Sequence, residues 1–231
     1  YITIASAGNA TDFGDMLVAY TDDEGLANST RAIFSMFAGG SSLTNINYVT
    51  IASTGDALDF GDLSAYKSSG SANCSGTEAV QNETGFPPAA IGLFAGGLGS
   101  DTNSRSAITY VNITTDGEGA MFGDLSIKKH AQYGGAANTT RGVFMGGYES
   151  SNHEFVTFST KGIATNFGNS IDNVNYNGGT TSNETRGILG GGYTSASTRS
   201  NAIEYITIAS VGNSTDFGDL TIGRFEVLAF G

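Results

Sequence analysis

The sequence predicts an all-β protein, and more specifically a β-propeller of five blades. Three observations predict this fold. One phrase recurs five times, a glycine pair ends a hydrophobic run before four of the copies, and the composition is rich in Gly (34) but poor in Pro (2) and in charged residues (14%). Such a composition suits short strands joined by turns. We therefore expect residues 1–231 to form a single propeller domain.

The repeated phrase begins with an aromatic residue and carries a phenylalanine 12 residues later. Its first copy, Tyr1 to Asp15, is followed by copies at 48–62, 110–124, 155–169 and 205–219. The β-branched first half predicts a strand. Gly beside Asn or Asp in the middle, as in Gly8-Asn9, predicts a tight hairpin turn, because such turns need positive φ. A second short strand carries the phenylalanine and is expected to end at Gly-Asp.

A second hydrophobic run precedes four of the phrases and predicts a buried strand. The small and polar residues before each run leave room for one further strand and a loop. Four short strands in a unit of about 40–50 residues are typical of a propeller blade, and fixed internal spacing with variable spacers is typical of stacked repeats. The run ends each time in a glycine pair, at Gly39 and Gly40, Gly96 and Gly97, Gly146 and Gly147, and Gly191 and Gly192.

The glycine pair, followed by two aromatic residues at fixed spacing, resembles the kelch repeat. The chain has no Trp, which kelch blades usually carry at the second aromatic position, so the repeat is a kelch-like variant. The resemblance implies that the aromatic residues pack between blades and that the glycine pairs let the backbone approach the neighbouring blade. The aromatic positions are Tyr1 and Phe13, Tyr48 and Phe60, Tyr110 and Phe122, Phe155 and Phe167, and Tyr205 and Phe217.

The two ends of the chain carry different parts of one repeat unit. The chain opens with a hairpin phrase, and Leu220 to Gly231 follows the last Gly-Asp as the start of a further unit would. We expect this C-terminal segment to join the N-terminal hairpin and complete the fifth blade. Closure of the ring would remove exposed sheet edges. Whether that blade has three or four strands stays open, because it lacks a clear Gly-Gly strand.

The charge balance and the cysteine count exclude several classes of partner. The net charge is −12, whereas a nucleic-acid backbone needs a footprint of Lys and Arg. No stretch approaches the ~18 apolar residues of a membrane-spanning helix. Cys74 is the single cysteine, and together with His130 and His153 it supplies too few ligands for a transition-metal site. We expect no cofactor, no metal, no nucleic acid and no membrane insertion.

No catalytic arrangement of residues emerges from the sequence. Neither histidine lies in a nucleophile motif. Repeated aspartates such as Asp12 and Asp15 could gather calcium, but calcium takes six to eight oxygens, and capping of turns is the simpler interpretation. A glycan hydrolase needs two converging carboxylates, whereas aspartates at equivalent sites of different blades would form a ring. We therefore expect a non-enzymatic protein and assign no catalytic residue.

The longest spacer, Ser64 to Ala90, departs most from the repeat. It holds both prolines and the cysteine, and loops on a rigid scaffold often carry the binding residues. Within it we take Tyr66, Lys67 and Phe86 as candidate binding residues. The alternative is a surface insertion without a role, since long insertions cost little stability.

The repeated phrase, ending in Gly-Asn-x-Thr-Asp-Phe-Gly-Asp-Leu, is similar to repeats in structural proteins of marine tailed phages, especially cyanophages. That resemblance implies a virion protein, such as a capsid decoration, a fibre tip or an adhesin. Its expected partners are other virion proteins or host-surface glycans, at the virion surface or outside the cell, in a homo-oligomer or another symmetric assembly. Two alternatives stay open: a bacterial or secreted carbohydrate-binding or adhesive propeller, and, less favoured, a glycan-active enzyme.

Overall fold

Strands are the only regular elements in the described part of the computed structural model, and they form four four-stranded antiparallel sheets and one two-stranded sheet. Within those residues no helix is long and apolar enough to cross a membrane. The structure describes residues 1–3, 5, 8–19, 23–36, 44–64, 71–74, 90–99, 103–130, 134–148, 150–171, 174–176, 178–194, 198–225 and 227.

Each four-stranded sheet, here called a blade, is built from successive strands of the chain. Blade 1 contains β1 (Asp23–Ala27), β2 (Arg31–Met36), β3 (Asn45–Thr50) and β4 (Leu58–Asp62). Blade 2 contains β5 (Ser71–Cys74), β6 (Ile91–Ala95), β7 (Arg105–Asn112) and β8 (Ala120–Lys129). Blade 3 contains β9 (Gly134–Ala137), β10 (Arg141–Met145), β11 (Asn152–Thr157) and β12 (Thr165–Asn169). Blade 4 contains β14 (Gly179–Ser182), β15 (Arg186–Gly190), β17 (Ala202–Thr207) and β18 (Thr215–Asp219).

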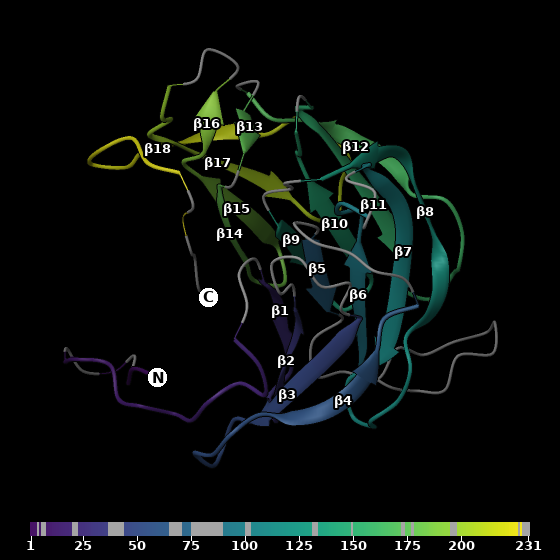
Figure 1. Cartoon of the computed structure of the whole chain (residues 1–231). Coiled ribbons are helices and arrows are strands. Elements are labelled where there is room, and N and C mark those ends of the chain that lie inside the picture. The colour runs from purple at the N-terminus through teal and green to yellow at the C-terminus, as the bar shows by residue number, and fades with distance from the viewer. Residues whose placement is uncertain are drawn as a thin grey trace.

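The blades are arranged as in a propeller. Their first strands contact one another in the order β1, β5, β9 and β14, and Figure 1 shows these strands in the middle of the molecule, with β4, β8, β12 and β18 toward the outside. The small extra sheet pairs β13 (Val174–Tyr176) with β16 (Tyr193–Thr194) and was not expected. Among the described residues no sheet joins blade 4 to blade 1, so the expected five-bladed ring is not complete there.

Four copies of the repeated phrase form hairpins, but their loops are not the tight turns expected at the glycine. In blade 1 the turn comes earlier, where Ser53 N donates to Thr50 O at 3.2 Å. Gly55 N instead donates to Phe13 O at 2.8 Å, in the N-terminal copy of the phrase (Tyr1–Asp15, here called the N-terminal hairpin). The prediction of a tight Gly-Asn or Gly-Asp turn was therefore wrong, because this glycine contacts the preceding hairpin.

A β-bulge lies opposite the Phe-Gly pair of each hairpin. In blade 1, Ile46 pairs with Gly61 and Asn47 pairs with Asp59, so Phe60 is the extra residue. Gly61 has φ of +140°, which a residue with a side chain rarely adopts. A bulge of this kind redirects the side chain of the extra residue. In blade 2, where the bulge recurs, β8 continues beyond Gly-Asp to Lys129, so the expected end of the strand at Gly-Asp was wrong there.

The first turn of blades 1, 3 and 4 is specified by the sequence Asn-x-Thr-Arg. In blade 1, Asn28 Oδ1 accepts hydrogen bonds from Thr30 N and Arg31 N, both at 2.8 Å. An Asn side chain that bonds the backbone two residues on stabilises such turns. The same bonds form at Asn138 and Asn183.

The hydrophobic core lies between neighbouring blades. Three clusters of buried side chains fill the spaces between blades 1 and 2, blades 2 and 3, and blades 3 and 4. Each cluster takes residues from both blades; between blades 1 and 2, for example, Ile33 and Phe60 pack with Phe94 and Val111. Stability therefore depends on how closely one sheet face fits the next.

Two glycines of β15 provide a test of this fit. A Cβ on Gly187 would overlap the Cβ of Ala136 in blade 3, whereas a Cβ on Gly190 would meet only Ile203 Cγ1 at 3.8 Å. We expect Gly187→Ala to lower the free energy of unfolding by about 1–3 kcal/mol, the usual cost of overpacking. Gly190→Ala should leave the free energy of unfolding, measured by urea denaturation, unchanged. Equal effects at the two positions would contradict the packing described here.

Candidate functional site: polar contacts between the blades

The structure brings the two aromatic residues of every phrase together. All five pairs meet edge to face, with ring centroids 5.9–6.4 Å apart. This is a favourable geometry for two aromatic rings. The pairs are Tyr1–Phe13, Tyr48–Phe60, Tyr110–Phe122, Phe155–Phe167 and Tyr205–Phe217.

A cation covers the leading ring in each of the four blades. Arg31, Arg141 and Arg186 lie over the rings of their own blades at 4.3, 4.7 and 4.4 Å from the centroid. Blade 2 has Ile91 where the other blades have this arginine. There Lys161, from the hairpin loop of blade 3, lies 4.4 Å from the centroid of Tyr110. A cation–aromatic contact is thus kept in blade 2 by a residue of the next blade.

Two of these arginines also form polar contacts with the following blade. Arg31 Nη1 forms an ion pair with Asp116 Oδ1 of blade 2 at 2.6 Å. Arg141 Nη1 donates to Ile208 O at 3.3 Å and to Ala209 O at 2.9 Å, both in the hairpin loop of blade 4. The two arginines therefore link ring packing within a blade to contact between blades.

The residue before the leading aromatic is polar and buried in every blade. It is Asn47, Thr109, Glu154 or Glu204. In three blades this side chain binds the segment that leaves the preceding blade: Thr109 Oγ1 lies 2.8 Å from Ser64 Oγ, and Ile171 N donates to Glu204 Oε2 at 2.9 Å. Sequence reasoning missed these residues, although their fixed place before the aromatic was a usable signal.

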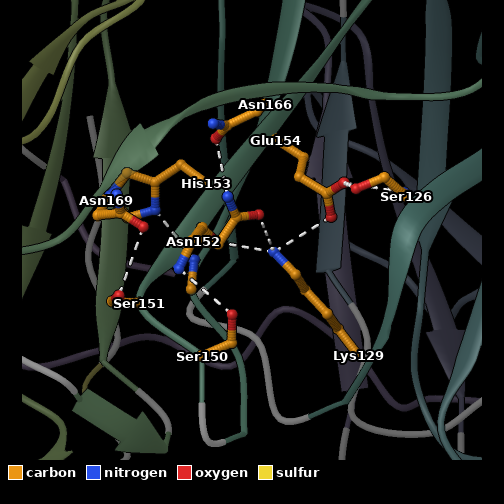
Figure 2. A network of polar contacts seen from close by, with 10 residues as sticks. Ser126, Lys129, Ser150, Ser151, Asn152, His153, Glu154, Asn166 and Asn169 are labelled. Carbon is orange, nitrogen blue, oxygen red and sulfur yellow. Dashed lines mark hydrogen bonds and ion pairs between the residues drawn. The ribbon is translucent and has the colours of Figure 1, made fainter.

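The charged version of this contact lies between blades 2 and 3. Lys129 Nζ is 3.2 Å from Glu154 Oε2 and donates to Asn152 O at 2.7 Å. Ser126 donates to Glu154 Oε1 through its backbone N at 2.8 Å and through its hydroxyl. Figure 2 shows the Lys129 amine between Asn152 and the Glu154 carboxylate, with Ser126 on the other side of that carboxylate.

Burial controls the protonation of this network. The side chains of Lys129 and Glu154 are 1% and 0% exposed. Burial lowers the pKa of Lys129, and the Glu154 carboxylate opposes that shift. The ion pair thus offsets part of the cost of taking both charges out of water.

His153 lies beside this pair and contacts blade 4. Gly146 N donates to His153 Nδ1 at 3.1 Å, so the neutral ring carries its proton on Nε2, which donates to Ser214 Oγ at 3.0 Å. Burial, and secondarily the charge of Lys129, lowers the pKa of His153 to about 3. The network therefore spans blades 2, 3 and 4.

The first aspartate of three phrases bonds to the backbone beside the phenylalanine, and in blades 1 and 4 it does so within a strand rather than in the expected turn. Asp12, Asp59 and Asp216 each accept a hydrogen bond from the glycine N two residues later, at 3.2, 3.2 and 3.0 Å. The described residues contain no group of three or more His, Cys, Asp or Glu side chains that could hold a metal ion.

The glycine pairs at Gly96, Gly146 and Gly191 adopt positive φ at both positions, from +58° to +138°. Their backbone contacts neighbouring segments; Gly97 N donates to Lys129 O at 2.9 Å, for example. Gly39 and Gly40 lie outside the described residues, as do the candidate binding residues Tyr66, Lys67 and Phe86. Cys74 ends β5.

The Lys129–Glu154 pair is expected to be the most costly polar contact to break from one side. Lys129→Met leaves a buried carboxylate without its cation, so urea denaturation should show a loss of about 3–5 kcal/mol. The double variant Lys129→Met/Glu154→Gln should recover part of that loss. The neighbouring exposed residue provides the control, because Lys128→Met should change stability by less than about 0.5 kcal/mol. If Lys129→Met lost no more stability than Lys128→Met, the buried ion pair would not have the role described here.

Stability should fall as the pH drops from about 6.5 to about 3. In that range the unfolded chain protonates His153, whereas the folded chain, with its pKa lowered to about 3, does not. The stabilisation is thus complete above pH 6.5 and is lost as the pH falls, by about 1.4 kcal/mol per pH unit. The free energy of unfolding, measured by urea denaturation at each pH, should change less with pH in His153→Gln than in His130→Gln. Identical slopes would exclude His153 as the source.

Comparison with known proteins supports the architecture alone. No protein-family model matches the sequence, and no curated protein matches it. Among solved structures, the chain is similar to the one titled "Structure of YjhT", with a TM-score of 0.68 and 8% sequence identity over 91% of this chain and 68% of that chain. Identity this low shows a shared propeller-like fold and does not extend to function.

Proposed function

We propose that this chain is a non-enzymatic scaffold for binding or assembly. The observation that supports this proposal most directly is that several ionisable side chains are buried in contacts between blades. Lys129, Glu154 and His153, three groups that could serve in acid–base chemistry, are buried and bonded to neighbouring blades. A catalytic group must reach its substrate, and these side chains do not reach solvent.

We also propose that the scaffold is a kelch-like propeller of five blades, the last completed by the two ends of the chain. The N-terminal hairpin already contacts the β3–β4 loop, since Ala57 N donates to Asp15 O at 2.8 Å. At the other end, Val227 O would lie 2.7 Å from a Cβ on Gly179 at the start of β14. Because β14 contacts β9 as β9 contacts β5, a chain segment next to β14 supports the proposal that a fifth blade follows blade 4.

The role that we propose is that of a virion structural or appendage protein. The repeated phrase is similar to repeats of marine phage structural proteins, and a net charge of −12 disfavours binding to nucleic acid. Its partners would be other virion proteins or host-surface glycans, at the virion surface or outside the cell. The segment from Ser64 to Ala90 would carry the contact, because it is the longest spacer between two copies of the repeated phrase.

A glycan array with the purified chain tests the binding role. We expect binding without turnover of the bound glycan. The triple variant Tyr66→Ala/Lys67→Ala/Phe86→Ala should weaken binding at least tenfold with an unchanged melting temperature. Ile163→Ala, at an exposed hairpin loop of blade 3, should bind as the unaltered chain does. Hydrolysis of a bound glycan would contradict the non-enzymatic role.

Immunogold labelling of purified phage particles tests the location. Label at the particle surface is the expected result. Label confined to bacterial cells or to secreted material would favour a bacterial carbohydrate-binding or adhesive propeller.

A further inference from the structure

One backbone contact joins every pair of successive hairpins. The glycine-containing loop of one hairpin, here called the donor loop, gives two N–H groups to the Phe-Gly-Asp or Phe-Gly-Asn strand of the preceding hairpin, here called the acceptor strand. Between blades 1 and 2, Gly117 N donates to Phe60 O at 2.8 Å and Gly119 N donates to Asp62 O at 2.6 Å. The contact recurs between the N-terminal hairpin and blade 1, between blades 2 and 3, and between blades 3 and 4.

Each of these contacts needs a glycine in the acceptor strand. A Cβ on Gly61 would lie 2.5 Å from the carbonyl oxygen of Gly117 in the donor loop, well inside van der Waals contact. Gly14, Gly123 and Gly168 would overlap their donor-loop glycines in the same way. The donor-loop side chain adds a third bond in two cases, since Asn169 N donates to Asn213 Oδ1 at 3.0 Å and Asp15 N to Asp56 Oδ1 at 3.0 Å.

The five copies of the phrase provide five donor loops and five acceptor strands, but only four contacts are made among the residues that the structure describes. The unused acceptor strand is Phe217–Asp219 of blade 4, and the unused donor loop is Gly8–Ala10 of the N-terminal hairpin. A Cβ on Gly218 or on Gly8 would meet nothing within 4 Å. Phe217 is 54% exposed, whereas Phe60, Phe122 and Phe167 are 2–3% exposed.

Both unused surfaces keep the features of the filled ones. Gly218 has φ of +140°, the same as Gly61, and Gly218 N donates to Asp216 Oδ1 as Gly61 N donates to Asp59 Oδ1. Arg186 lies over Tyr205 as Arg141 lies over Phe155. Asn9 occupies the place of Asn213 in the donor loop. Blade 4 and the N-terminal hairpin therefore carry the matching halves of the contact that joins the other hairpins.

A buried amide of blade 1 also lacks partners, on the side of that blade that faces the N-terminal hairpin. Asn47 is 1% exposed, and both polar atoms of its side chain lack a hydrogen-bond partner. The equivalent side chain in blade 4, Glu204, binds Ile171 N, four residues after Phe167. The residue four places after Phe13 is Leu17, which is exposed. A buried amide without partners is costly, and the segment that follows Phe13 does not make the contact with Asn47 that Ile171 makes with Glu204.

We propose that the acceptor strand Phe217–Asp219 binds the donor loop Gly8–Ala10 of the same chain. This inference rests on the fifth blade proposed above and assigns its closing contact. Gly8 N would donate to Phe217 O, Ala10 N to Asp219 O, and Asp219 N to Asn9 Oδ1. Arg186 would bind the Ala5 carbonyl, as Arg141 binds that of Ala209. One hairpin serves both sides, because every hairpin of blades 2 and 3 already donates on one side and accepts on the other.

Disulfide trapping tests the contact. The variant Asn9→Cys/Asp219→Cys, with Cys74→Ser to remove the native thiol, should form an intrachain disulfide under mild oxidation. The matched control, Asn169→Cys/Asn213→Cys with Cys74→Ser, places cysteines at a contact that the structure already shows. Non-reducing gels and peptide mass spectrometry separate the outcomes. Disulfide-linked dimers or ladders would assign the acceptor strand to a second copy, and no bond while the control forms one would exclude the contact; either result overturns the proposal.

A pair of glycine variants gives an independent readout. Gly61→Ala and Gly218→Ala suffer the same backbone strain, since both residues have φ of +140°. They differ in that Gly61 faces a donor loop and Gly218 does not. If Gly8–Ala10 fills the acceptor strand in solution, the two variants should shift the urea midpoint equally. A clearly smaller shift for Gly218→Ala overturns the proposal. Neither experiment depends on glycan binding or on virion labelling, so the proposed function can fail or hold separately.

Discussion

The close approach of backbone to backbone between successive hairpins is the constraint from which the rest of the structure follows. The acceptor glycine admits the donor loop because it has no Cβ, and the loop then delivers two N–H groups to a strand edge. This distance determines how closely the sheet faces approach, and hence how the core clusters fill the space between them. The β-bulge serves the same contact, because it places Gly61 at a φ that exposes its backbone to the next hairpin.

Within this constraint, the blades vary the chemistry of their polar contacts. In blades 2, 3 and 4 the side chain before the leading aromatic contacts the segment leaving the preceding blade, but Thr109 does so through a hydroxyl pair and Glu154 through an ion pair. The cation over the aromatic ring varies likewise: Lys161 of blade 3 covers Tyr110, where blade 2 lacks the arginine. Conserved geometry with exchangeable side chains is what a repeat protein needs in order to diverge without unfolding.

Much of the local structure could be predicted, because it depends on residues that are close together in the sequence. The β-branched runs, the aromatic spacing and the glycine pairs correctly indicated hairpins and four-stranded units. The tight turn at Gly55 was wrong because its N–H group bonds to Phe13, a partner that no local pattern reveals. The buried network of Lys129, Glu154 and His153 was missed for the same reason, since its members come from different blades and look like ordinary strand residues in sequence.

The sequence by itself determined the all-β class, the repeat unit and the aromatic pairs, because these depend on residues within one unit. The tertiary structure alone decided which groups of one unit meet those of the next. It showed that aspartates such as Asp59 bond the backbone two residues on, that the histidine at position 153 is buried and neutral, and that the loop glycines contact the preceding hairpin. The physical reason is that burial and backbone contact across an interface depend on both surfaces at once, whereas a sequence pattern describes only one of them.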